Sequence, residues 1–335
     1  MIATESTGSR ISAPKTVHAK PATNSILSRL DLSEGDFHRF QQLIYRETGM
    51  WMAPSKKSLI AGRLAKRLRH LGVATLRQYF NCVQTDDAER QQMLNLVSTH
   101  ETHFFREPRQ FDYIAEELVP YWIRQGEAGR RTRTLRVWSA GCSSGEEAYS
   151  IAMLLLDRLP ASAGWQIQVL ATDMATDVLA TAQRGVWPIE KAREIPPALL
   201  RRFMLKGVGP SAGTMKAGPE IQSAIRFARV NLHQEPYPLQ GVFDLIFCRN
   251  VLIYFDQRSK EGVLRRLFSH LATDGRLFLG HAENLSGSSE LAAGVFTNVY
   301  AHASRGVERS PKQPPRQSKI RAEHFAQVLE KESTQ

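Results

Sequence analysis

The sequence predicts an α/β fold built on a parallel sheet, preceded by an all-helical domain. First, a short apolar run at residues 135–138 turns through small residues into a helix-forming run at residues 146–159. Second, another buried-strand pattern follows at residues 166–171. Strands that alternate with helices are typical of parallel sheets. Third, residues 33–97 show helical periodicity and no strand pattern, which predicts a separate helical domain.

The chain divides into four parts. Residues 1–32 are polar and lack periodicity, so we expect a disordered tail. The helical domain follows at residues 33–97, the α/β domain at residues 98–304, and a basic, Pro-rich tail at residues 305–335. The expected helices of the first domain span residues 36–48, 55–71, 76–84 and 86–97. Gly72 is expected to end the second of them as its C′ residue.

The turn after the first strand has the features of a ligand-binding turn. Gly141 and Gly145 let the backbone come close to a ligand, and the N–H groups of the following helix start face it. Ser144 and Glu147 have the spacing of a capping box. Two glycines also fit a tight connection that binds nothing, because the full dinucleotide fingerprint is missing. The second strand, however, ends in Asp173, which is placed to accept hydrogen bonds from ribose hydroxyls.

Charge in this turn favours a cationic cofactor over a pyrophosphate. The turn contains no Lys or Arg, and Glu146 and Glu147 would repel a phosphate at the helix start. S-adenosylmethionine carries a sulfonium and an α-amino group but no phosphate. The sequence therefore favours a methyltransferase that uses this cofactor.

Further strands are expected at residues 243–247, 275–280 and 295–301, and one more between about residues 284 and 294 cannot be assigned. Arg249 and Asn250 follow the first of these, at the carboxyl edge where active sites of parallel sheets lie. The next residues carry Tyr254 into the same region. Between residues 201 and 229 the alternation breaks into short apolar pieces separated by Gly and Pro, which predicts a small antiparallel insertion.

Composition favours a cytoplasmic protein. The hydrophobic fraction of 42% is ordinary, no apolar run approaches the roughly 18 residues of a membrane span, and the first residues lack the apolar core of a signal peptide. Cys82, Cys142 and Cys248 have no metal-ligand spacing, so we expect neither a disulfide framework nor a metal site. Three histidines lie in separate segments without ligand spacing and are expected on the surface or hydrogen-bonded in the core rather than in a metal site: His103, His233 and His281.

Five segments of the chain resemble the chemotaxis receptor methyltransferases, the CheR family. They are STHETHFFREPRQF (98–111), VWSAGCSSGEEAYSIA (137–152), ATDMATDVLATAQRGVW (171–187), FDLIFCRNVLIYFD (243–256) and GRLFLGHAENL (275–285). The resemblance runs from about Asp36 to His302. It implies a Rossmann-like class I S-adenosylmethionine-dependent methyltransferase domain with a β-subdomain insertion, after an all-α domain.

The resemblance also implies the activity. It is methyl transfer from S-adenosylmethionine to glutamate side chains of methyl-accepting chemoreceptors, giving glutamate methyl esters and S-adenosylhomocysteine. Arg106 and Tyr254 would lie near the transferred methyl, Glu146 would pair with the cofactor's amino group, and Asp173 with its ribose. The residues expected to contact the cofactor are His100, Thr102, Arg106, Glu146, Asp173, Asn231, Leu232, Arg249 and Asn250. At residue 100 many members have Asn, and His would add a pH dependence.

The chain carries a formal net charge of +11, with a basic sector on the second helix. Its expected substrate-binding residues are Lys56, Arg63, Lys66 and Arg67, beside an inward stripe of Ile60, Leu64, Leu68 and Leu71. A solvated face is the alternative. Nucleic-acid binding is not expected, because no nucleic-acid module is visible. The resemblance favours Glu-rich receptor helices as the partner, which this sector would steer toward the active site.

Other possibilities stay open. In some members of the family the β-subdomain docks a peptide at the receptor's C-terminus; a structural flap is the alternative here. We expect a monomer that is not inserted in the membrane. A methyltransferase acting on small molecules or nucleic acid, and a non-catalytic cofactor-binding module, are the competing functions; the latter would be favoured by loss of Arg106, Asp173 or Tyr254, all of which are present.

Overall fold

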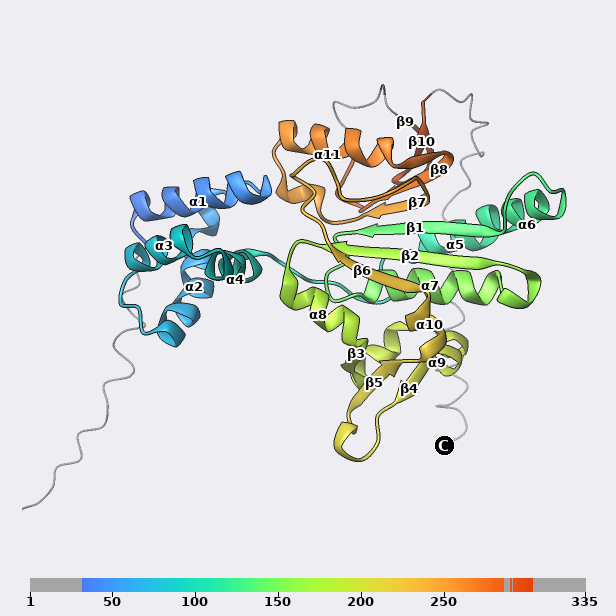
Figure 1. The fold of residues 1–335 in the computed structure, drawn as a ribbon, viewed down its shortest axis with the longest axis horizontal. Coiled ribbons are helices and arrows are strands. Elements are labelled where there is room, and N and C mark those ends of the chain that lie inside the picture. The colour runs from blue at the N-terminus through green and yellow to red at the C-terminus, as the bar shows by residue number, and fades with distance from the viewer. Residues whose placement is uncertain (1–31, 286–289, 291, 304–335) are drawn as a thin grey trace, which may run out of the picture.

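The computed structural model describes residues 32–285, 290 and 292–303. Helices α1 to α4 form a group beside the α/β part of the chain, and a small sheet projects from the α/β part (Figure 1). The tails expected at residues 1–32 and 305–335 lie outside the described residues, apart from Leu32. Within the described residues, no helix is both long and apolar enough to cross a membrane.

The expected helices of the first domain are confirmed to within two residues at every end. They are α1 (Glu34–Thr48), α2 (Lys57–Leu71), α3 (Leu76–Thr85) and α4 (Asp87–Val97), with the 3-10 turn η2 (Pro54–Lys56) before α2. Side chains that accept backbone N–H groups at the starts of α1, α3 and α4 explain where these helices begin: Ser33, Thr75 and Asp86. Gly72 ends α2 in the left-handed region at φ 64°, as expected.

The inward stripe of α2 is confirmed for three of its four members. Ile60, Leu64 and Leu68 are buried in the core of the helical domain. Leu71 is 39% exposed, so its expected burial is wrong. It is the last residue of α2, directly before the left-handed C-cap residue Gly72.

The main sheet has seven strands in the order β6-β2-β1-β7-β8-β10-β9. Its first five strands are parallel, and β10 runs antiparallel to both of its neighbours. The strands are β1 (Thr134–Ala140), β2 (Gln166–Asp173), β6 (Ile225–Arg229), β7 (Phe243–Cys248), β8 (Leu271–Leu279), β9 (Ala292–Phe296) and β10 (Val299–His302). The strand order reverses between β1 and β7, the point where open α/β sheets bind ligands.

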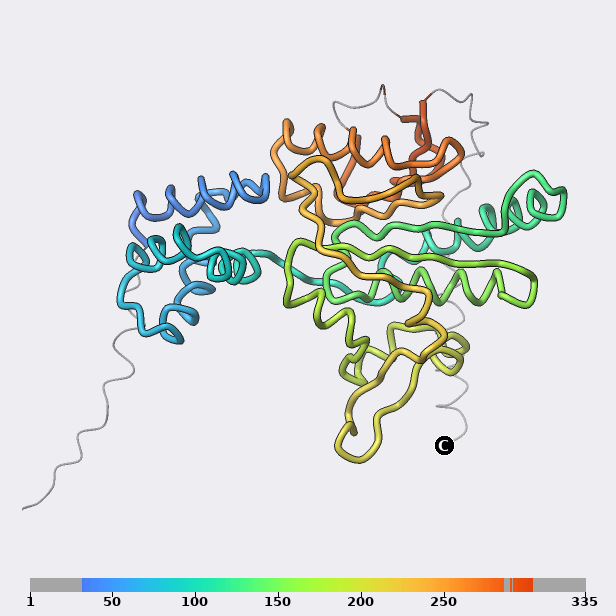
Figure 2. Tube along the Cα trace, viewed as in Figure 1, coloured from blue at the N-terminus to red at the C-terminus, as the bar shows by residue number. Residues whose placement is uncertain are grey.

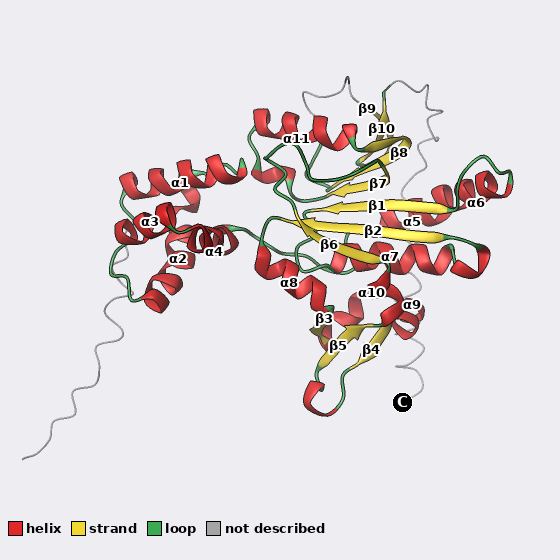
Figure 3. Ribbon diagram, viewed as in Figure 1, coloured by secondary structure: helices red, strands yellow, loops and turns green. Residues whose placement is uncertain are grey.

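Alternating side chains divide the interior into two layers. On β1, Leu135 and Val137 join one core cluster, whereas Trp138 and Ala140 join the other. Successive side chains of a strand point to opposite faces, so each strand of the sheet serves both layers. Figure 3 shows α11 on one side of the sheet and α7 and α8 on the other.

Helices of the α/β part cover both faces of the sheet. They are α5 (Pro108–Tyr113), the π-helix η3 (Ile114–Leu118), α6 (Val119–Glu127), α7 (Glu146–Arg158), α8 (Thr176–Arg184) and α11 (Gln257–Ser269). Short 3-10 turns connect other elements: η4 (Ala161–Ala163), η5 (Ile189–Glu194), η6 (Gly209–Ser211) and η7 (Leu252–Tyr254).

The predicted antiparallel insertion exists, but its limits differ from residues 201–229. Its sheet has the order β3-β5-β4, formed by β3 (Val186–Pro188), β4 (Met204–Lys206) and β5 (Thr214–Ala217), with α9 (Pro197–Phe203) and α10 (Pro219–Ser223) beside it. It begins at β3, earlier than expected. Strand β6 belongs to the main sheet, because it pairs with β2 in parallel register. The tube in Figure 2 shows the β4–β5 connection as the end of this projection.

The strand expected at residues 295–301 is instead a hairpin. Strands β9 and β10 pair antiparallel, and Asn298 turns the chain between them at φ 56°. Asn is one of the few residues that enter this conformation readily. Strand β9 overlaps the end of the range of residues 284–294, in which one strand could not be assigned from the sequence.

Candidate active site

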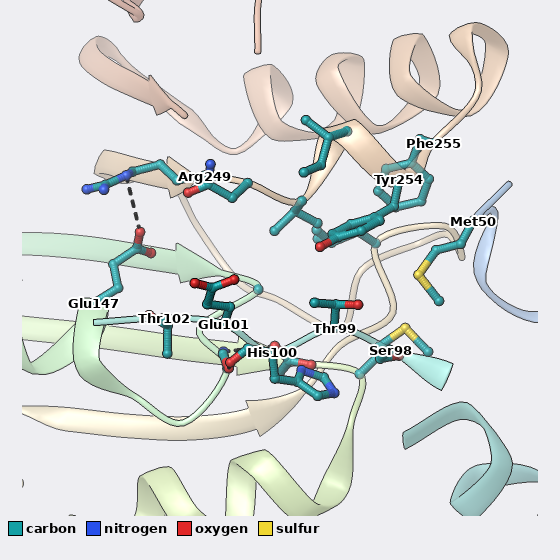
Figure 4. A pocket seen from close by; sticks show the side chains of 18 of the residues that line it. Met50, Ser98, Thr99, His100, Glu101, Thr102, Glu147, Arg249, Tyr254 and Phe255 are labelled. Carbon is teal, nitrogen blue, oxygen red and sulfur yellow. Dashed lines mark hydrogen bonds and ion pairs between the residues drawn. The ribbon is translucent and has the colours of Figure 1, made fainter. Parts of the chain in front are cut away.

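A cavity of about 260 Å³ opens at the carboxyl ends of β1, β2 and β7, between them and the helical domain. Figure 4 shows it from close by, with Arg249 and Glu147 at one end and Tyr254, Phe255 and Met50 at the other. Nearly all residues expected to contact the cofactor or the methyl group line it: His100, Thr102, Arg106, Asp173, Asn231, Leu232, Arg249, Asn250 and Tyr254. The exception is Glu146.

The turn after β1 forms one wall of the cavity. Gly141 has φ +85°, and a Cβ there would lie 2.5 Å from Cγ2 of Val251, so only glycine fits. The N–H groups of Gly141 and Cys142 both donate to the carbonyl of Thr172, at 2.8 and 2.9 Å, which ties the turn to β2. The expected capping box is wrong, because Gly145 occupies the N-cap position of α7 and the Ser144 hydroxyl donates to Glu146.

Asp173 ends β2 with its carboxylate buried at the cavity. Its two oxygens accept the N–H groups of Ser143 and Ala175, each at 2.9 Å. These bonds hold the carboxylate in place and leave its remaining lone pairs free for a ligand. Burial raises the pKa of Asp173, although the backbone hydrogen bonds oppose that effect.

Glu146 does not face the cavity. Its carboxylate lies 2.5 Å from Nζ of Lys191, which also donates to the carbonyl of Thr102. Successive helical residues point in directions about 100° apart, so the next residue, Glu147, takes the cavity-facing position. The expected contact of Glu146 with the cofactor is therefore not supported by its geometry.

Glu147 and Arg249 form a buried charged pair in the cavity. Nε of Arg249 lies 3.6 Å from a carboxylate oxygen of Glu147 and 3.6 Å from one of Glu107. Burial raises the pKa of Glu147, against the opposing effects of Arg249 and a hydrogen bond from Ser139. Nη1 of Arg249 is buried without any hydrogen-bond partner, as is Nε2 of His100. Buried polar atoms normally have partners, so these atoms indicate a ligand.

The loop after β7 carries the remaining site residues, and a residue without a predicted role holds it. Glu283 is 3% exposed and accepts the N–H groups of Gly280, Asn250 and Leu252 at 2.7, 2.8 and 2.7 Å. Asn250 itself has φ 60°, a left-handed conformation that Asn adopts more readily than most residues. Glu283 lies in the segment GRLFLGHAENL, whose family resemblance was the one sequence feature that could have pointed to it. Its role could not be predicted, because it binds backbone N–H groups, which any residue type can supply.

The helical domain closes one side of the cavity. Thr48 and Met50 line it, and Met50 forms a β-bridge with Phe255. The N–H of Trp51 donates to the carbonyl of Tyr254 at 2.8 Å, and the side chain of Asn231 donates to the carbonyl of Glu47 at 2.6 Å. Two site residues therefore depend on the helical domain for their positions.

The expected substrate-binding residues fall into two groups. Arg63 donates to the carbonyls of Val97 and Ser98, and Arg67 makes two hydrogen bonds to the buried carboxylate of Glu89. Both side chains thus connect parts of the protein itself. Lys66 is exposed, and Nζ of Lys56 lies 5.3 Å from the centroid of the Tyr254 ring. Lys56 is the member of this set that reaches the cavity's edge.

The three cysteines are free, and Cys142 and Cys248 are buried. Burial raises the pKa of both thiols well above the usual range, so neither is poised as a nucleophile. No group of three or more His, Cys, Asp or Glu side chains that could hold a metal ion occurs among the residues that the structure describes.

These features fit S-adenosylmethionine. The buried carboxylate of Asp173 at the end of β2 can accept hydrogen bonds from a ribose. Glu147 and the unpaired guanidinium N–H of Arg249 can bind the amino group and the carboxylate, respectively, of one ligand that carries both. Fold and cavity together define a class of protein: an α/β enzyme that binds a nucleoside-bearing cofactor at the switch point of its sheet.

Comparison with known proteins identifies the family. Residues 100–301 match the model "CheR methyltransferase, SAM binding domain", and residues 35–98 match "CheR methyltransferase, all-alpha domain". A chemotaxis protein methyltransferase of Escherichia coli strain K12 is 40% identical over 261 residues, 77% of this chain and 87% of that protein. Chemotaxis protein methyltransferase 2 of Pseudomonas aeruginosa is 37% identical over 268 residues, 80% and 93% of the two chains.

A solved glycopeptide N-methyltransferase, MtfA complexed with sinefungin, aligns with a TM-score of 0.29 at 13% identity, over 53% of this chain and 54% of that one. The chain belongs to the CheR methyltransferase family, as the sequence segments indicated. It is an S-adenosylmethionine-dependent methyltransferase, and the predicted fold class is confirmed.

Proposed function

We propose that this protein is a protein-glutamate O-methyltransferase that methylates glutamate side chains of methyl-accepting chemoreceptors. The observation that carries the proposal is the meeting of Arg106, Asp173 and Tyr254, from three separate segments, in one cavity of a CheR-family chain. The named relatives are chemotaxis protein methyltransferases, which supports chemoreceptors as the substrate.

S-adenosylmethionine, when bound, supplies a methyl group on a positively charged sulfur. Asp173 accepts hydrogen bonds from the ribose hydroxyls, and Asn231 and Leu232 flank the adenine. Glu147, in place of the expected Glu146, pairs with the amino group, and Arg249 binds the carboxylate. His100 and Thr102 lie along the same wall of the cavity, and Nε2 of His100 is free to hydrogen-bond a ligand.

The acceptor carboxylate needs no general base, because a glutamate side chain is ionised at neutral pH. The work of the protein is therefore to orient that carboxylate and to exclude water from it. Tyr254 and Arg106 line the cavity where it enters. A strong salt bridge to the acceptor would oppose transfer by stabilising the ground state. The Arg106 guanidinium donates to the carbonyl of Glu101 at 3.2 Å, which helps to position it at the cavity.

Lys56 and Lys66 supply positive charge that attracts a Glu-rich receptor helix. Arg63 and Arg67 add to the positive electrostatic potential of the same surface, although their hydrogen bonds are to other parts of this chain. We propose that the protein acts in the cytoplasm, as a monomer, and that the β4–β5 connection is the place where a receptor's C-terminal peptide would dock. Leu205 of β4 and Val208 of the connection are 55% and 75% exposed, which supports a contact surface.

The test is transfer of labelled methyl from S-adenosylmethionine to membranes that contain chemoreceptors, followed by mild alkali. Release of the label as volatile methanol is expected, because carboxyl methyl esters hydrolyse under these conditions. Tyr254→Phe should lose transfer while it keeps cofactor binding. Cofactor binding without alkali-labile transfer to any receptor would overturn the proposed substrate and leave the methyltransferase class intact.

A further inference from the structure

The edge of the cavity beside Tyr254 carries exposed apolar side chains that the reaction itself does not need. Trp51 is 51% exposed and Ile253 is 50% exposed. Ile253 lines the cavity and directly precedes Tyr254 in the chain. The N–H of Trp51 donates to the carbonyl of Tyr254 at 2.8 Å, which fixes Trp51 beside it. We call Trp51, Lys56 and Ile253 the Tyr254 rim.

Trp51 is held in place rather than loosely displayed. Its ring packs edge-on against Tyr45, with 6.0 Å between the ring centroids, and Tyr45 in turn donates to Asp256 at 2.7 Å. An aromatic ring that is already ordered loses little conformational freedom when a partner covers it. Exposed tryptophans of this kind are enriched among the residues that dominate binding energies.

The rim combines apolar surface with one positive charge. Nζ of Lys56 lies 5.3 Å from the centroid of the Tyr254 ring. A patch of this composition fits a partner that presents a carboxylate and an apolar side chain together. On an α-helix, residues three or four positions apart share one face. A helix that directs a glutamate to Tyr254 therefore brings its neighbours one turn away onto the rim.

We propose that the Tyr254 rim is a specificity surface that selects glutamates having an apolar side chain one helical turn away. This inference rests on the proposed function, since its occupant is an amphipathic helix of the chemoreceptor substrate. Trp51 and Ile253 contact the apolar side chain, and Lys56 orients the acceptor carboxylate. The remaining acidic residues of such a helix face the basic sector of α2, which gives the two partners complementary charge.

The experiment compares methylation of one chemoreceptor cytoplasmic fragment by the full-length chain and its variants Trp51→Ala and Ile253→Ser. Each variant should raise KM for the fragment. For Trp51→Ala, whose side chain does not line the cavity, KM should rise by about ten-fold or more, with kcat and the Kd for S-adenosylhomocysteine within two-fold of wild type. Trp51→Phe, which keeps a ring against Tyr45, should restore much of the loss. Val242→Ser is the matched control: Val242 is 48% exposed but directly precedes β7, at the end of the sheet away from the cavity.

A second arm changes the substrate. Replacing the apolar residue one turn from the methylated glutamate by Lys should raise KM for the wild-type enzyme but have little further effect on Trp51→Ala, because the two changes remove the same contact. The proposed role of the Tyr254 rim would be overturned by an equal KM for wild type and both rim variants, or by fully additive effects of the enzyme and substrate substitutions. Either result would leave the proposed function intact. No methyl ester from the wild-type enzyme on any receptor fragment would overturn both.

Discussion

Glu283 holds Leu252 in place: a carboxylate oxygen of Glu283 accepts the N–H of Leu252 at 2.7 Å. The other oxygen accepts the N–H groups of Asn250 and Gly280. A Cβ at Gly280 would lie 2.8 Å from this carboxylate, so glycine is required for the approach. One buried anion therefore positions the segment that leads to Tyr254, without itself lining the cavity.

Glu283→Ala and Glu283→Gln should both lower kcat. A displacement of the loop after β7 by about one ångström is expected to lower kcat by about 100-fold. Glutamine has the same size, but its NH2 group would face N–H donors and could not accept from them. KM for the cofactor should change less than kcat, because Asp173 and Arg249 are held by other contacts. Steady-state kinetics with Glu290→Gln as the control tests this. Wild-type kcat in Glu283→Gln would show that the loop keeps its shape without the anion.

Burial raises the pKa of Glu283, although hydrogen bonds from the backbone at Gly280, Asn250, Leu252 and Ile253 oppose the effect. Protonation removes acceptor capacity that the loop needs. Activity should therefore decline on acidification at a higher pH than an ordinary glutamate would produce. A kcat–pH profile checks this, and circular dichroism at each pH separates the decline from unfolding.

Asp173→Asn should weaken binding of S-adenosylhomocysteine by about ten- to hundred-fold, because hydrogen bonds to a charged acceptor contribute most at a buried site. The raised pKa of Asp173 adds a pH dependence. Since the proposed ribose contact requires the ionised form, affinity should fall as the pH falls toward this raised value. Calorimetric titration across pH, with the exposed Asp177→Asn as control, measures both effects. Unchanged affinity in Asp173→Asn would disprove the ribose assignment.

The strands of the parallel sheet could be predicted because their buried runs are long and continuous. The start of the small sheet could not, because β3 and β4 have three residues each and such short strands leave no periodicity. The hairpin of β9 and β10 was mistaken for one strand, since Asn298 interrupts the apolar run with a single turn residue.

The residues of the candidate site could likewise be predicted only in part. Residues that follow strand ends, such as Asp173 and Arg249, could be placed because parallel strands end at one edge. Which of two adjacent glutamates faces the cavity depends on the rotation of α7, and Gly145 sets that rotation at the N-cap where Ser144 was expected. The part of the cavity formed by Met50 and Thr48 depends on how two domains pack, which no local pattern encodes.

Cysteine reactivity should follow burial. Cys82 is partly exposed, whereas burial raises the pKa of the Cys142 and Cys248 thiols well above the usual range. Iodoacetamide at pH 8 should therefore alkylate Cys82 first, and the other two only after denaturation. Mass spectrometry of the native and denatured protein measures the order, and Cys82→Ser is the control. Rapid alkylation of Cys142 in the native protein would show that the turn after β1 opens.

Arg67 and Lys66 are neighbours on α2 and were both expected to bind substrate, but Arg67 pairs with Glu89 whereas Lys66 is exposed. Arg67 and Tyr79 both donate to the buried carboxylate of Glu89. Arg67→Gln should therefore lower the free energy of unfolding by about 3 kcal/mol, because it leaves a buried charge without its partner. Lys66→Gln should leave stability unchanged and reduce only the salt-dependent part of receptor methylation.

The pH dependence of stability separates these roles. Burial alone would raise the pKa of Glu89, but the hydrogen bonds from Arg67 and Tyr79 outweigh it and lower the pKa. A carboxyl group whose pKa is lowered in the folded state stabilises the fold at pH values above its ordinary pKa of about 4.3. It loses that contribution as the pH falls through the lowered pKa. The stability gap between wild type and Arg67→Gln should thus be widest at neutral pH and narrow below about pH 4.3. Urea unfolding of both variants across pH measures the gap, and a gap that is absent at pH 7 would show that Arg67 is free to bind substrate.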